Sequence, residues 1–176
     1  MVQNDLLYYT TDILHKEIPS EVSLCISIAG CSVGCTECNS KWLWLNKGEP
    51  LTGNVIDSLL EKHPYVTCVC LLGESDNWVW VNFLNAYIKE KHGKKTALYT
   101  GHSLPEALRF LNIRFLDYLK VGSYIKGLGG LDSKTTNQRL YSIDFVECQR
   151  KEKKEEVVFT DITYKLNQIK IKQNED

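Results

Sequence analysis

The sequence predicts an α/β domain built on a largely parallel sheet, and the order of its apolar segments is the main reason. Short apolar runs of strand length alternate with longer segments whose apolar residues recur at helical spacing, which is typical of right-handed βαβ units. One apolar run, residues 66–72, has the composition of a strand covered on both faces. The chain has 176 residues. Since a domain typically has about 150 residues, we expect a single domain over residues 1–176.

The expected elements alternate along the chain. Strands are predicted at residues 22–28, 66–72, 96–100 and 116–121, and helices at residues 51–63, 76–92 and 104–111. Thr52 and Ser103 are suited to cap the first and third helices, because their hydroxyl groups accept hydrogen bonds from the free N–H groups of a first turn. Gly93 fits the end of the second helix.

The pattern changes after residue 122. Glycines between residues 127 and 130 indicate a flexible loop, and residues 139–147 are predicted as an edge strand. The mixed-charge run at residues 149–156 is predicted to be a solvated hairpin loop rather than a binding arm. A complete (β/α)₈ barrel needs about 250 residues, so this chain has room for about five or six units at most. A partial barrel and an open, flavodoxin-like sheet both fit that length.

Composition excludes several classes of function. The net charge is −1 from 21 basic and 22 acidic residues, which gives no general nucleic-acid footprint. No run of about 18 apolar residues is present, so no membrane span is expected, and the first residues lack the pattern of a secretory signal. We therefore expect a cytoplasmic protein. In that reducing compartment, the seven cysteines are expected to be core residues, metal ligands or catalysts rather than disulfides.

Three of these cysteines form the main chemical signal of the sequence. Cys31, Cys35 and Cys38 have the spacing C-x₃-C-x₂-C and closely follow the first predicted strand. Gly30 and Gly34 allow the chain to turn tightly around a common centre. Cysteine thiolates are the usual ligands of iron–sulfur clusters, and a 4Fe–4S cluster held by three thiolates keeps one iron open for another ligand. The carboxyl end of a strand is also where α/β enzymes place their active sites.

A structural zinc site and three unrelated thiols are the alternatives. A closed zinc site has four ligands, and the nearest candidates for the fourth are Cys25 and His63. Cys25 lies inside a predicted strand. Cys68 and Cys70 are expected to be inert buried thiols, and Cys148 is isolated in the sequence, so that no second cluster is expected.

The spacing and position of the cysteine motif resemble those of the radical S-adenosylmethionine (SAM) superfamily. The resemblance implies a partial (β/α) barrel of about five or six mostly parallel strands, with one 4Fe–4S cluster bound by Cys31, Cys35 and Cys38. It also implies that the open iron binds the amino and carboxylate groups of SAM, and that one electron from the reduced cluster releases a 5′-deoxyadenosyl radical. No catalytic residue beyond the cluster ligands is implied. The protein binds and orients the cofactor and excludes water.

The resemblance extends to residues that would bind SAM. The superfamily usually has a Gly-Gly-Glu-like segment after its second strand, and this chain has Leu72-Gly73-Glu74, with Leu72 in place of the first glycine. Glu74 would receive the amino group of SAM through a charge-assisted contact. The alternative for Glu74 is an acid that complements the dipole of the next helix. The residues implied in cofactor binding are Glu37, Cys38, Asn39, Gly73, Glu74, Thr100 and Lys120.

Three further segments resemble the activating proteins of anaerobic (class III) ribonucleotide reductases, a family of glycyl-radical enzyme activases. They are residues 98–101 (LYTG), 117–125 (DYLKVGSYI) and 128–141 (LGGLDSKTTNQRLY). The resemblance implies an oxidoreductase whose 5′-deoxyadenosyl radical takes a hydrogen atom from a glycine of the large reductase subunit, with a reduced flavodoxin or ferredoxin as electron donor. Asn137 and Arg139 would hold the glycine loop of this partner. Their alternatives are a turn residue and a surface cation.

Two other functions stay open on the sequence. One is a small-molecule radical SAM enzyme of the 7-carboxy-7-deazaguanine synthase type, which shares the cysteine motif but is not expected to have the segment at residues 128–141. The other is a non-catalytic zinc-binding adaptor, which would be colourless and would hold zinc.

Overall fold

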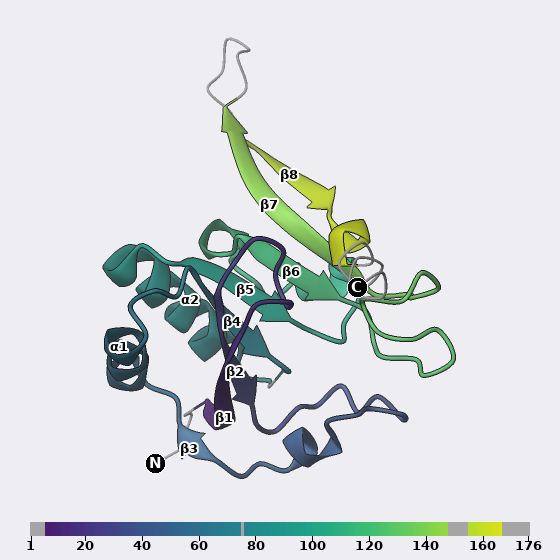
Figure 1. The fold of residues 1–176 in the computed structure, drawn as a ribbon, viewed down its shortest axis with the longest axis horizontal. Coiled ribbons are helices and arrows are strands. Elements are labelled where there is room, and N and C mark those ends of the chain that lie inside the picture. Colours follow the sequence, from purple (N-terminus) through teal and green to yellow (C-terminus); the bar gives the residue numbers. More distant parts are fainter. Residues whose placement is uncertain (1–5, 75, 148–154, 167–176) are drawn as a thin grey trace, which may run out of the picture.

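The computed structural model describes residues 6–74, 76–147 and 155–166. Its centre is one eight-stranded sheet with the strand order β3-β1-β2-β4-β5-β6-β7-β8 (Figure 1). The strands are β1 (Leu7–Leu14), β2 (Ser23–Ile28), β3 (Glu49–Pro50), β4 (Cys68–Leu72), β5 (Lys95–Tyr99), β6 (Tyr118–Val121), β7 (Arg139–Glu147) and β8 (Glu155–Asp161). The charged run that was predicted as a hairpin loop falls mostly on residues 149–154, which lie outside the described residues, as does Cys148.

The sheet is mixed, and this corrects the predicted fold. β2, β4, β5 and β6 run parallel in the middle, but the four other pairings, β1 with β2, β1 with β3, β6 with β7 and β7 with β8, are antiparallel. The prediction of a partial (β/α) barrel of the radical SAM type, with about five or six mostly parallel strands, is therefore wrong. The helical segments that produced the sequence rhythm connect only the parallel strands. Antiparallel neighbours need no crossover helix, so their pairing left no comparable signal.

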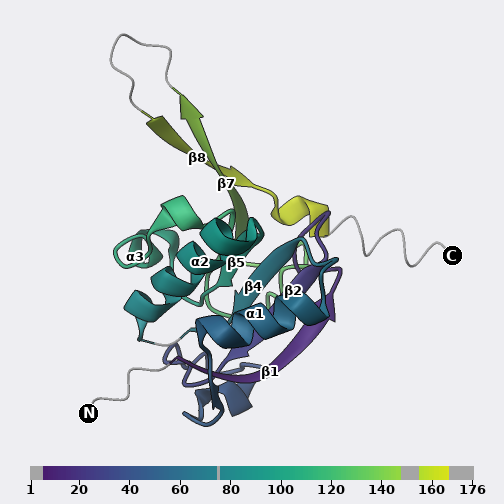
Figure 2. The same ribbon diagram turned by 90° about the vertical axis from the view of Figure 1, so that its left-hand side faces the viewer.

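The two long helices cover one face of the sheet. α1 (Gly53–Lys62) and α2 (Trp78–His92) lie side by side over the parallel strands (Figure 2). Thr52 Oγ1 accepts a hydrogen bond from Val55 N at the start of α1, and Gly93 ends α2 with a φ of +61°, so both predicted helix ends are confirmed. The third predicted helix is shorter than expected, because α3 spans only Leu104–Ala107. The described residues also contain two 3-10 helices, η1 (Lys41–Trp44) and η2 (Ile113–Phe115), and residues 163–166 are helical.

No helix within the described part of the chain combines the length and the apolar character that a membrane crossing requires.

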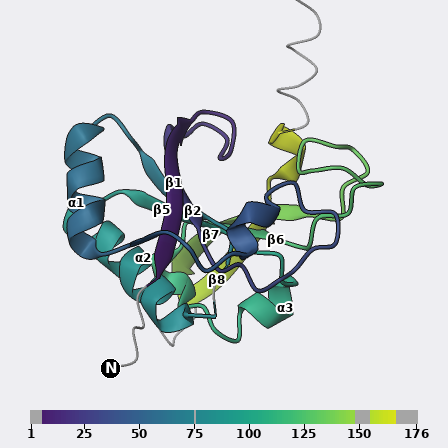
Figure 3. The same cartoon turned by 90° about the horizontal axis from the view of Figure 1, so that it is seen from below.

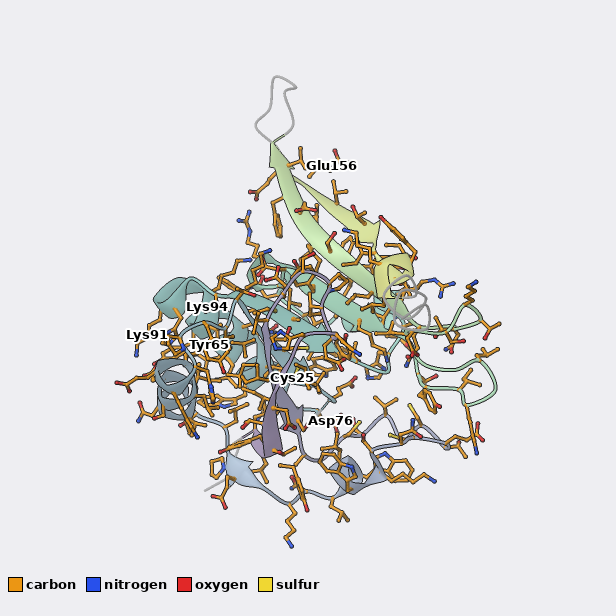
Figure 4. All side chains as sticks on the ribbon, viewed as in Figure 1. Cys25, Tyr65, Asp76, Lys91, Lys94 and Glu156 are labelled. Atoms are coloured by element: carbon orange, nitrogen blue, oxygen red, sulfur yellow. The ribbon has the colours of Figure 1, made fainter. Side chains whose placement is uncertain are left out.

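The two faces of the central strands have separate apolar cores. Leu24 and Ile26 of β2 face the core beneath the helices, whereas Cys25 between them faces the opposite core together with Cys68 and Cys70 of β4. The prediction that Cys68 and Cys70 are buried is confirmed, and Cys25 is buried as well. Burial raises the pKa of Cys68 and Cys70. Cys25 lies within the sheet (Figure 4). The three cysteines therefore belong to the packing of the sheet and not to the loop with Cys31.

Candidate functional site

The cysteine loop, residues 29–40, leaves the carboxyl end of β2 and is fastened to the segment that follows it. Gly30 N donates a hydrogen bond to the carbonyl oxygen of Leu45 (3.1 Å), and Cys31 N donates to that of Leu43 (2.8 Å). The buried side chain of Leu43 anchors η1 beneath the loop. Gly30 and Gly34 have φ angles of +77° and +63°, which confirms that the turns of the loop favour glycine. Figure 3 shows the loop and η1 on the other side of β1 from α1.

The three cysteines of this loop are free and half-buried. Cys31, Cys35 and Cys38 form no disulfide. Cys38 N donates to the carbonyl oxygen of Cys35 (2.9 Å), and Ser40 N donates to Cys38 Sγ (3.2 Å), which orients that sulfur. Within residues 6–74, 76–147 and 155–166, no group of three or more His, Cys, Asp or Glu side chains is arranged to hold a metal ion. The thiols fit an iron–sulfur cluster in number and chemistry, and the loop would have to close around it.

A buried cation, Lys120, lies near the end of β6 and within the electrostatic range of all three thiols. Burial lowers the pKa of Lys120 to about 8, and negative charge on the three cysteine sulfurs counteracts that effect. Lys120 Nζ donates to the carbonyl oxygen of Gly122 (2.8 Å) and also to that of Thr100 (3.4 Å). The fold thus brings the predicted residue Lys120 to the cysteine loop.

Glu74 supplies the opposite charge at the end of β4, which β5 separates from β6. It follows β4 and is only 2% exposed. Gly73 before it has a φ of +94°, and a Cβ there would lie 3.2 Å from the carbonyl oxygen of Ile28, so the close approach to β2 favours glycine. Thr100 Oγ1 donates to Glu74 Oε2. Burial raises the pKa of Glu74, while the hydrogen bond from Thr100 and the nearby His102 oppose that shift.

His102 belongs to the site although the sequence did not single it out. Its Nε2 lies 2.5 Å from Glu74 Oε1. The distance suits a hydrogen-bonded ion pair, but the alignment does not, and Oε1 accepts no hydrogen bond from the described residues. His102 N donates to Thr100 Oγ1 (3.0 Å), so one hydroxyl group links both residues. The sequence feature that could have identified His102 as a site residue is its position two residues after Thr100, at the end of a predicted strand.

Two contacts hold the cysteine loop against the ends of β4 and β5. A Cβ on Gly101 would collide with Val33 Cγ1 and would lie 3.1 Å from Val33 Cγ2. Ser32 Oγ donates to Asp76 Oδ1 (2.9 Å), and Figure 4 shows Asp76 at the edge of the sheet where the loop begins. The loop is therefore packed on two strand ends that are distant from it in the sequence.

Glu37 and Asn39 are exposed residues of the same loop. Glu37 Oε2 accepts a hydrogen bond from Lys126 N (3.2 Å), which ties the loop to residues 122–138 at the same edge of the sheet (Figure 1). Asn39 lines a cavity of about 630 Å³ together with Lys120 and Tyr99. Tyr99 and Leu131 in its wall pack against the core opposite the long helices, so the cavity lies on that face of the sheet.

Asn137 and Arg139 are bound mainly to backbone of their own region. Asn137 Nδ2 donates to the carbonyl oxygen of Ser123 (2.9 Å). Arg139 Nη1 donates to the carbonyl oxygens of Thr136 (2.8 Å) and Gln138 (2.7 Å). These contacts give both side chains a part in the shape of the loop between β6 and β7.

The charges at these strand ends match a zwitterionic ligand. Thr100 contacts both charged residues, since its carbonyl oxygen lies 3.4 Å from Lys120 Nζ and its hydroxyl group donates to Glu74. An ammonium group on β6 and a carboxylate after β4, on either side of β5, can bind the carboxylate and the amino group of one amino acid moiety. The free thiols beside them offer soft ligands for iron or zinc.

No family model matches the sequence, and no match was found among curated proteins or among solved structures.

Proposed function

We propose that the chain is an oxidoreductase that reductively cleaves SAM at a 4Fe–4S cluster bound by Cys31, Cys35 and Cys38, and that it generates a glycyl radical on an anaerobic (class III) ribonucleotide reductase. The observation that carries this proposal is that three free thiols lie within the electrostatic range of Lys120, which shares Thr100 as a neighbour with Glu74. A fold by itself does not imply an activity. The mixed sheet therefore neither implies nor excludes this chemistry, and the proposal depends on the residues at the strand ends.

The charged residues would orient the methionine part of SAM. Lys120, with a pKa of about 8, is mostly protonated at neutral pH and would bind the carboxylate group. Glu74 Oε1, which accepts no hydrogen bond from the described residues, would accept one from the amino group. When bound, the cluster supplies an open iron and one electron for breaking a carbon–sulfur bond of SAM. The half-buried loop would limit the access of water to that centre.

The large reductase subunit would bind at the cavity that is lined by Lys120. The cavity of about 630 Å³ contacts Lys120 and has Tyr99, Tyr124 and Gln138 in its wall. These side chains offer flat apolar surface and hydrogen-bonding groups, which suit the backbone of a glycine loop from the large reductase subunit. The resemblance in sequence further supports a reduced flavodoxin or ferredoxin as electron donor and the cytoplasm as the compartment.

The test is to mix the protein, reconstituted anaerobically with iron and sulfide, with a reductant, SAM and the cognate reductase. Electron paramagnetic resonance is expected to show the doublet of a glycyl radical on the reductase, and chromatography is expected to show 5′-deoxyadenosine. Cleavage of SAM without a radical on the reductase would reject the partner and favour a small-molecule enzyme of the 7-carboxy-7-deazaguanine synthase type. A colourless protein that retains zinc and cleaves no SAM would support the adaptor instead.

Matched cysteine variants locate the cluster. Cys35→Ala is expected to abolish cleavage, because the loop then has only two thiols. Cys25→Ala removes a thiol that is buried in the sheet and is expected to keep both the brown colour and the cleavage. Cleavage by the Cys35 variant, or loss of the cluster in the Cys25 variant alone, would contradict the assignment of ligands.

A further inference from the structure

We propose that His102 occupies the ammonium site of Glu74 in the ligand-free protein and yields it to the amino group of the ligand, so that His102 competes with ligands that carry a free amino group and weakens their binding. This inference rests on the proposed function, because it takes SAM as the ligand. It adds a residue that lies on the turn after β5, contacts the buried carboxylate and limits how tightly an amino group binds there.

The contact between His102 and Glu74 is close but replaceable. Nε2 lies 2.5 Å from Oε1, yet the ring is not aligned well enough for Oε1 to accept a hydrogen bond. Thr100 satisfies the other oxygen, Oε2. A buried carboxylate oxygen without an aligned donor is costly, and an ammonium group with three donors can meet it in better geometry. Exchange of the imidazole for the ligand therefore improves the partner of Oε1.

The side chain of His102 can leave without a change in the backbone. His102 N is held by Thr100 Oγ1 (3.0 Å), and its carbonyl oxygen accepts from Gly122 N (2.7 Å), so the main chain is fixed at both groups. The side chain itself is 33% exposed, in contrast to Glu74. Rotation of the ring alone would open Oε1.

A second carboxylate, Glu106, lies near the other ring nitrogen of His102, and its Oε2 also accepts hydrogen bonds from Ser103 N and Ser103 Oγ. Nδ1 of His102 lies 3.9 Å from Glu106 Oε2 on α3, and the ring centroid of Trp78 on α2 lies 6.0 Å from that of His102. Asp76 adds negative charge beside Glu74. The imidazole thus faces acidic groups on two sides and would keep a favourable partner after it leaves Glu74.

Binding measurements can isolate this exchange. The anaerobically reconstituted protein is titrated by calorimetry with S-adenosylhomocysteine, which has the amino group, and with 5′-methylthioadenosine, which lacks the whole amino acid part. His102→Ala is expected to bind S-adenosylhomocysteine about tenfold more tightly than the wild type, which equals about 1.4 kcal/mol, and to bind 5′-methylthioadenosine with unchanged affinity. His63→Ala, at the end of α1, serves as the matched control and should change neither affinity.

A second readout does not depend on the stability of the alanine variant. In the wild type, the imidazole proton resonances of His102 should shift on addition of S-adenosylhomocysteine but not of 5′-methylthioadenosine. His102→Gln, which retains a polar side chain, should give an affinity between those of the wild type and His102→Ala. An unchanged ratio of the two affinities in both variants, or a stationary His102 signal, would overturn the role of His102 alone. Failure of every protein to bind either nucleoside would overturn the proposed function as well.

Discussion

Gly101 lies against the side chain of Val33, so that a Cβ at position 101 would collide with Val33 Cγ1. This contact joins the end of β5 to the middle of the cysteine loop, between Cys31 and Cys35. The loop therefore depends on a residue that is remote from it in the sequence, and the contact can be tested by substitution.

Gly101→Ala is expected to displace the cysteine loop, because overpacking at a close contact costs about 1–3 kcal/mol. The iron content after anaerobic reconstitution should fall below that of the wild type. Adding Val33→Ala should restore it, since this second change removes the colliding methyl groups. Gly127→Ala is the control, because a Cβ at position 127 would meet no atom within 4 Å. Full iron content in Gly101→Ala would show that the loop does not rely on this contact.

Lys120→Met is expected to stabilise the protein at neutral pH at the expense of ligand binding. The folded-state pKa of about 8 lies below the ordinary 10.5, so burial of the charged amine reduces stability below about pH 8. That penalty fades as the pH rises from about 8 to 10.5, because the folded protein releases its proton before the unfolded chain does. The variant should gain up to about 3 kcal/mol in the free energy of unfolding at pH 7, and less at pH 10.

Urea denaturation of the wild type and the variant at both pH values measures this difference. Lys126→Met, at an exposed position, is the control and should show no comparable dependence on pH. An equal difference between Lys120→Met and the wild type at pH 7 and pH 10 would mean that Lys120 titrates normally.

Asp57→Asn is expected to loosen α1 from α2. Asp57 accepts hydrogen bonds from Lys91 (2.8 Å) and Tyr87 (2.9 Å), and its Oδ1 lies 2.8 Å from His92 Nε2. The hydrogen bond from Lys91 has the largest effect on Asp57, and together with those from His92 and Tyr87 it lowers the pKa of this carboxyl to about 2. Since the folded-state pKa is the lower one, this stabilisation is present above the ordinary value of 3.8 and disappears as the pH falls toward 2.

The melting temperature of Asp57→Asn should lie a few degrees below that of the wild type at pH 7, and the gap should narrow at pH 2.5. Glu61→Gln changes an exposed acid of the same helix and should leave the melting temperature nearly unchanged at pH 7. A gap of the same size at both pH values would assign the loss to packing instead of charge.

Local sequence pattern predicted the helix-linked middle of the fold. The strands expected at residues 22–28, 66–72, 96–100 and 116–121 correspond to β2, β4, β5 and β6, because buried parallel strands are apolar runs between amphipathic helices. The pattern failed at the sheet margins. β1 is only half-buried along its length, and the predicted edge strand β7 is an inner strand because β8 pairs outside it. These pairings depend on partners rather than on periodicity, so the mixed sheet was not foreseen.

The sequence by itself determined which reactive groups the chain possesses and where they stand on its elements. Three thiols at C-x₃-C-x₂-C spacing, an acid after one strand and a lysine on another are local facts. Only the tertiary structure decided which of them meet. The register of β4, β5 and β6 brings Glu74, Thr100 and Lys120 to one edge, and the turn after β5 places His102 at Glu74. Strand pairing decides which side chains at the strand ends lie close together, and the local sequence of one strand does not determine its partners.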